Sequence, residues 1–208
     1  APPADLYKVA RPLLEPECGA QAKARALKSV EFALSRGASP SWWRGPGTPL
    51  RAGVDAQCDC LVQALLRARA NPNEHGPLCV GLLHLAAASG QEETCRSLLE
   101  ARADANVVDC HGQTPLFFAP CPTICEALQA GRADLCAVSL GGQSALHAAA
   151  TAGHGRTALW LARRASRAMV CMRDARGLTA LECAKLAGLR LEVLEALEQA
   201  GEAPAAAA

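Results

Sequence analysis

Cysteine and histidine are the residues of this chain best suited to chemistry, because thiolates and imidazoles act as nucleophiles, general bases and metal ligands. The sequence holds 11 cysteines and 5 histidines. The closest cysteine pairs are Cys58 with Cys60 and Cys121 with Cys125, and no Cys-x-x-Cys pair combines with a second at a zinc-finger spacing. The odd count, in a chain long enough to build a core without crosslinks, favours free thiols in a reducing compartment.

A nucleophile and a base stand side by side at Cys110 and His111. Adjacent residues of an extended hairpin project to opposite sides, and no third group is placed to orient the imidazole. The sequence also has no glycine-rich phosphate loop, no Gly-x-Ser-x-Gly motif and no carboxylate pair at a useful spacing. We therefore expect no enzyme activity, no cofactor and no bound metal.

The composition excludes several classes of partner. Lys and Arg number 21 against 20 Asp and Glu, so the chain has no basic excess to neutralise nucleic acid. It contains no apolar run of about 18 residues, so no membrane insertion is expected, and nothing indicates a small-molecule substrate. Residues 1–5 do not resemble a signal peptide. We expect an intracellular, cytoplasmic protein, with the nucleus as the second compartment, and a segment of a longer polypeptide.

A repeat organises the sequence. Its anchors begin at Thr48, Gly81, Thr114, Ser144 and Thr179, which are 33, 33, 30 and 35 residues apart. Each opens a run such as Thr-Pro-Leu or Ser-Ala-Leu, glycines follow three of the anchors by nine residues, and a Leu-Leu pair ends two of the units. A Thr or Ser before an apolar run is typical of a helix N-cap, a following Pro suits the first helical position, and glycine ends a short helix.

These landmarks resemble the ankyrin repeat, most fully over residues 109–116 and less fully over 174–181. The resemblance covers about residues 20–201. It implies an all-α fold, an α-solenoid of stacked helix-turn-helix units joined by short β-hairpin loops. The low aromatic content of 3% agrees, because thin layers of Ala, Leu and Cys would replace one central core.

The repeat predicts unit boundaries and two irregular units. Pro120 and Pro122 should cut the inner helix after Thr114 to about one turn, and the unit from Ser144 should hold a small insertion near residues 163–167. The predicted segments are an N-terminal helical cap (1–45), five units (46–78, 79–111, a short irregular 112–141, 142–176 with the insertion, and a C-terminal capping unit 177–203) and a disordered tail (204–208).

Apolar stripes predict which faces of the terminal helices are buried. In the N-terminal cap the second stripe includes Val30 and Phe32, and in the last helix Leu191, Val193 and Leu197 should face inward.

The resemblance also gives the histidines and cysteines structural roles. His84 and His147 lie three residues after their anchors, where the family has a histidine that bonds back toward the capping residue. Cys95, Cys125 and Cys183 occupy core positions, and we expect most thiols to be small buried hydrophobes. Thiols of neighbouring units, such as Cys136 and Cys171, should lie too far apart for a disulfide because packed helices are about 8–10 Å apart. Cys110 should be exposed at a hairpin tip.

The pair Trp42-Trp43, followed by Arg44, lies in a Pro- and Gly-rich link. One interpretation is that a ring covers the N-terminal cap, and the other is that a ring is exposed for recognition, because Trp and Arg are favoured at binding hot spots.

The resemblance implies a non-catalytic protein–protein interaction module, a scaffold or adaptor that binds a protein partner through hairpin tips and the concave inner-helix face. The alternatives are a regulatory or targeting arm of a larger enzyme or channel, and a thiol-based redox or metal site. The predicted partner-binding residues are Trp42, Trp43, Arg44, His75, Ser89, Cys110, His111, Gln113, Gln143, Thr151 and Arg176.

Overall fold

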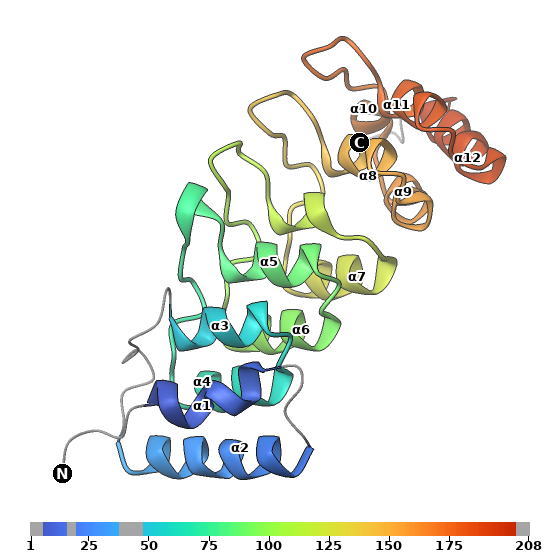
Figure 1. Cartoon of the computed structure of the whole chain (residues 1–208). Helices are drawn as coiled ribbons and strands as arrows, with labels where there is room; N and C mark the ends of the chain where they lie inside the picture. The colour runs from blue at the N-terminus through green and yellow to red at the C-terminus, as the bar shows by residue number, and fades with distance from the viewer. Residues whose placement is uncertain (1–5, 16–19, 38–47, 203–208) are drawn as a thin grey trace.

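Helices pack in two layers along a curved stack (Figure 1). The computed structural model describes residues 6–15, 20–37 and 48–202. The inner layer contains α1 (Leu6–Leu14), α3 (Pro49–Asp55), α5 (Leu82–Ala88), the 3-10 helix η2 (Pro115–Phe118), α8 (Ala145–Thr151) and α11 (Ala180–Leu186). The outer layer contains α2 (Ala20–Ser35), α4 (Asp59–Arg67), α6 (Glu92–Glu100), α7 (Pro122–Ala130), α9 (Gly155–Ala162) and α12 (Leu191–Glu202). The predicted all-α solenoid is confirmed.

Each helix packs against its partner in the other layer and against the next helix of its own layer. For example, α8 contacts η2 and α11 in the inner layer and α9 in the outer layer. Leucines fill the space between the layers, and Leu65, Leu98 and Leu128 are fully buried at equivalent positions of α4, α6 and α7. The core is therefore a series of thin apolar layers, each shared by two neighbouring helix pairs.

The predicted helix starts form in some units only. Thr48 and Thr179 accept hydrogen bonds at their hydroxyls from the backbone N–H groups of Arg51 (3.2 Å) and Glu182 (3.3 Å). Thr114 makes no side-chain cap hydrogen bond, and the η2 that follows it winds as a 3-10 helix. At the ends of α5 and α8, Gly90 and Gly153 adopt the left-handed backbone expected of them, with φ of 73° and 77°.

The helices after Thr114 and after α9 depart from those of the other units. The inner helix after Thr114 is the four-residue η2, and Pro122 instead begins α7. The insertion after α9 forms an extra helix, α10 (Arg167–Val170), which Ser166 caps by accepting a hydrogen bond from Met169 N at 3.4 Å. It packs against α12, so the added residues lie in the helical layers.

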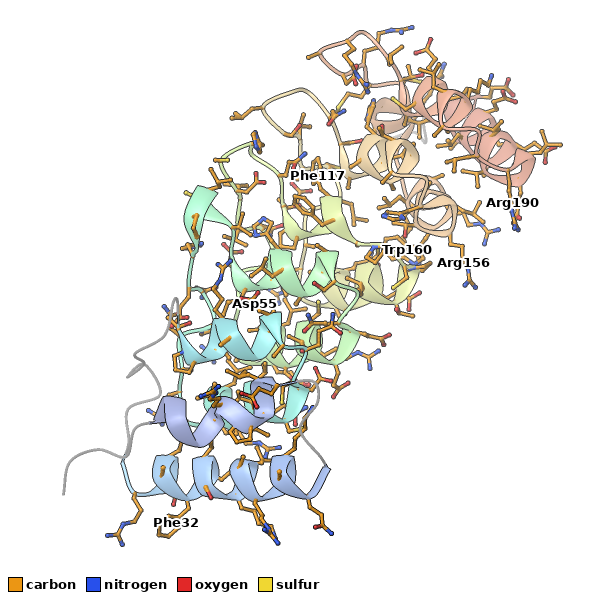
Figure 2. The ribbon with its side chains drawn as sticks, viewed as in Figure 1. Phe32, Asp55, Phe117, Arg156, Trp160 and Arg190 are labelled. Atoms are coloured by element: carbon orange, nitrogen blue, oxygen red, sulfur yellow. The ribbon has the colours of Figure 1, made fainter. Side chains whose placement is uncertain are left out.

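Two predictions about terminal helix faces are wrong. Phe32 is 67% exposed, and Figure 2 shows it projecting from α2 away from the stack. The buried side of α2 consists instead of Ala26, Val30 and Ala33. Leu191 is 68% exposed because it stands at the first position of α12, while Val193 and Leu197 are buried as predicted.

The prediction that most thiols are buried is also wrong. Among the ten cysteines in the described ranges, all free, only Cys95, Cys125 and Cys183 are buried. Burial raises the pKa of Cys95 and of Cys125 to about 12. The exposed cysteines are Cys60, Cys79, Cys110, Cys136 and Cys171. Four of these lie in the segments that connect one unit to the next, where a side chain has no neighbouring layer to enter.

Asparagines join successive units along the outer layer. The side chain of Asn73 donates to Arg102 O (3.3 Å) and accepts from Asp104 N (2.8 Å) in the next unit. Asn106 repeats this pattern with Arg132 O (3.0 Å) and Asp134 N (2.7 Å). These bonds hold the loops after α4, α6 and α7 in one register.

Candidate protein-binding surface

Four hairpin tips follow one another along one edge of the stack (Figure 1). We call them the tip row and define it as residues 77–79, 110–112, 140–142 and 175–177. The first tip forms the short helix η1 (Pro77–Cys79). Isolated antiparallel bridges close three of the hairpins at their bases, at residue pairs 75 with 81, 138 with 144 and 173 with 179.

Backbone hydrogen bonds tie each tip to the next. Cys110 N donates to Leu78 O (3.0 Å), Leu140 N donates to His111 O (2.9 Å), and Ala175 N donates to Gly141 O (2.9 Å). The tips therefore form one continuous row in which residues from successive units stand at fixed positions.

A buried polar side chain at the base shapes each of the last three tips. Asp109 Oδ1 accepts from His111 N (2.8 Å) and Gln113 N (2.9 Å). Asp174 Oδ1 accepts from Arg176 N (2.9 Å) and Leu178 N (3.0 Å), and Ser139 accepts from a single N–H. These side chains accept hydrogen bonds from the backbone N–H groups of the turn, and the side chains at the tip face outward.

The charge at the last tip is fixed by an ion pair. Arg176 Nη2 lies 2.8 Å from Asp174 Oδ2, and Gln143 Nε2 lies 3.5 Å from the same oxygen. Removal from water opposes ionisation of Asp174, but the N–H of Leu178 and the Arg176 side chain outweigh it and lower its pKa to about 2. Both groups are therefore charged over the physiological range.

Two buried histidines support the row from below. His84 Nδ1 accepts from Gly81 N (3.2 Å), and its Nε2 bonds to Gln113 O (2.9 Å) of the next hairpin. His147 Nδ1 bonds to Ser144 Oγ (2.8 Å), and its Nε2 lies 3.2 Å from Leu178 O. Burial lowers the pKa of both histidines, which keeps them neutral. The predicted backward bond is confirmed, and at His84 the backbone N–H of Gly81 replaces the missing hydroxyl.

The structure brings some of the predicted site residues together. Cys110 and His111 are exposed in the second tip and Arg176 in the fourth, while Gln113 and Gln143 are half-buried just after their tips. Ser89 and Thr151 are exposed at the ends of α5 and α8. Thr151 and Arg176 line a cavity of about 190 Å³, together with Cys183, Leu186 and Ala187. Trp42, Trp43 and Arg44 lie outside the described residues.

Sequence reasoning missed a larger cavity near the first hairpin. It has a volume of about 570 Å³, and its lining includes His75 from the predicted set with Thr48, Arg51, Asp55 and Glu74. The Thr48 hydroxyl donates to Glu74, and Arg51 Nε lies 3.6 Å from Asp55 Oδ2. The four-residue spacing of Arg51 and Asp55 on one helix was the available signal. Leu78, which is 68% exposed in the tip row, also escaped the predicted set. Leu140 in the same row is 83% exposed.

The geometry of the stack has a counterpart among known families. Residues 52–135 match the family model for ankyrin repeats, in three copies. Residues 52–135 are ankyrin repeats. The pairs α8 with α9 and α11 with α12 continue the stack in the same two layers and the same tip row. No curated protein matches the chain.

No helix in the described ranges is both long enough and apolar enough to span a bilayer. No group of three or more His, Cys, Asp or Glu side chains in the same ranges is arranged to hold a metal ion.

Proposed function

We propose that this chain is a non-catalytic protein–protein interaction module, a scaffold or adaptor that binds a partner protein through its tip row and the adjoining ends of the inner helices. The observation that carries the proposal is that the hairpins separate structural polar groups from exposed ones. Asp109, Asp174, His84 and His147 are buried and consumed by structural hydrogen bonds, whereas the tip side chains are exposed on a rigid row.

The chemistry of the row favours a partner that combines apolar and polar contacts. Leu78 and Leu140 present exposed apolar side chains, and Arg176 presents a cation beside the buried carboxylate of Asp174. A rigid row lowers the entropy that association would cost, because little backbone needs ordering on binding. The ankyrin repeats of residues 52–135 support the proposal, since such repeats generally bind proteins. We also propose that the units have the boundaries predicted from the sequence.

The test compares matched substitutions on the two sides of the stack. Leu140→Ala and Arg176→Ala change the tip row, while Leu191→Ala and Arg156→Ala remove the same exposed side-chain types from outer helices. In Figure 2 Arg156 projects from α9 on the side of the outer layer. Partners captured by the wild-type chain are identified and their affinities measured against all four variants.

We expect the tip variants together to weaken a captured partner at least about tenfold, and the outer variants to leave it unchanged. Circular dichroism of each variant verifies that the fold is kept. Equal binding by tip and outer variants, or a loss confined to the outer variants, would show that the tip row is not the partner-binding surface.

A further inference from the structure

A cysteine occupies a glycine position in the first tip. The last residue of the other three tips is Gly112, Gly142 or Gly177, with φ of 71°, 70° and 79°. Cys79 is the last residue of the first tip, and its φ is 57°. Left-handed backbone is unfavourable for a residue with a Cβ atom, so Cys79 adopts this conformation at a conformational cost that glycine avoids.

The first tip winds differently from the others, because Leu78 also has a positive φ of 60°, but the same backbone hydrogen bond joins it to the next tip. We therefore infer the direction of the Cys79 side chain from the equivalent glycines. A Cβ atom built on Gly112 would lie 3.1 Å from Leu140 N and 3.2 Å from Leu140 Cγ. One built on Gly142 would lie 3.4 Å from Ala175 N. Leu140 and Ala175 are the first residues of the following tips. A side chain that ends one tip therefore points at the residue that begins the next.

For Cys79 the residue that begins the next tip is Cys110. The hydrogen bond from Cys110 N to Leu78 O is 3.0 Å long. This bond and the covalent bonds on either side of it limit the separation of the two Cα atoms to about 7 Å. Disulfides form at Cα separations of about 4.4–6.8 Å. Both thiols are free and exposed.

The geometry points to a redox-sensitive dithiol site formed by Cys79 and Cys110, which closes to a disulfide between neighbouring tips. Helix spacing predicted that thiols of adjacent units lie too far apart, but the tips are joined by backbone hydrogen bonds and approach more closely than packed helices. The crosslink would covalently join two tips that a backbone hydrogen bond already connects in the reduced chain.

The oxidant is a low-molecular-weight disulfide such as oxidised glutathione. The thiolate of one cysteine attacks the glutathione disulfide, which releases one glutathione thiolate and leaves a mixed disulfide on the protein. The second protein thiolate then attacks the mixed disulfide and releases the other glutathione. One sulfur–sulfur bond breaks and one forms, the two protein thiols are oxidised by two electrons, and their protons pass to the two glutathione thiols.

The experiment treats the folded chain with oxidised glutathione, alkylates the remaining thiols, and maps crosslinked peptides by mass spectrometry without reduction. We expect a crosslink between Cys79 and Cys110 to form ahead of any other, and to disappear on adding a reductant. Cys136 and Cys171 serve as the internal control, because both are exposed in successive units but lie outside the tip row. We expect them to remain uncrosslinked.

Two variants that should keep the fold test whether the crosslink requires both cysteines. Cys79→Gly restores the residue that the other tips use, so it should fold at least as well as the wild type, and Cys110→Ala changes an exposed side chain. Each should abolish the crosslink and leave a glutathione adduct on the remaining thiol. Stable glutathione adducts on both wild-type cysteines without a crosslink would overturn the proposal, as would a faster crosslink of either thiol to another cysteine.

Discussion

Replacing Asn106 by Ala should uncouple two neighbouring units, because this side chain makes two hydrogen bonds to the loop after α7. Its Nδ2 donates to Arg132 O at 3.0 Å, and its Oδ1 accepts from Asp134 N at 2.7 Å. A hydrogen bond contributes a net of about 0.5–1.5 kcal/mol to stability. Asn106 is exposed, so water replaces part of what is lost. We therefore expect the variant to lose about 1–2 kcal/mol, or roughly 2–8 °C in melting temperature.

Asn71→Ala is the matched control. Asn71 is also exposed in a loop after an outer helix, but its side chain accepts a hydrogen bond only from Asn73 N, within its own loop, at 3.0 Å. Urea unfolding followed by far-UV circular dichroism would compare both variants with the wild type. Asn106→Ala should also broaden the transition, because coupling between units is what makes a linear stack unfold together. A loss no larger than that of Asn71→Ala would refute the reasoning.

Three further predictions follow from buried or strained groups. The pKa of His147 is lowered by burial, so below about pH 6.5 the unfolded chain binds a proton that the folded chain does not. The melting temperature of the wild type should therefore fall between about pH 7 and 5. The fall should be less steep in the His147→Gln variant. Arg102 has φ of 68°, so Arg102→Gly should raise the free energy of unfolding by about 1 kcal/mol, whereas Arg67→Gly in α4 should lower it similarly. Cys95 and Cys125, each with a pKa raised to about 12, should be alkylated far more slowly than the exposed thiols, as timed mass spectrometry would show.

The architecture was accessible from sequence because its determinants are local. The anchor at Thr179 and the prolines Pro120 and Pro122 act within one helical turn, so their positions predict where a helix begins and where one is cut short. The buried leucines follow the same period and lie where the repeat places them. Local signals of this kind can be interpreted without knowing how the neighbouring unit packs.

Burial at the ends of helices was harder to predict, because it depends on whether a neighbouring helix covers the residue. Phe32 and Leu191 continue apolar stripes in sequence, yet no neighbouring helix in the described ranges covers them. Most cysteines were expected inside because cysteine is often buried, but those in the connections have no second layer above them. The approach of Cys79 to Cys110 depends on a hydrogen bond between tips, which helix spacing does not reveal.

The tip row keeps its hydrogen bonds although the units differ in length. The anchors that follow the second, third and fourth tips are separated by 30 and 35 residues, and the same tip-to-tip hydrogen bond recurs between these tips. The residue deficit falls in the shortened η2 and the surplus in α10, both away from the tips. Insertions and deletions in the helical layers can thus accumulate during evolution while the order and pitch of the exposed side chains stay constant. An engineer could graft a domain into the segment before α10 and leave the opposite edge of the molecule unaltered.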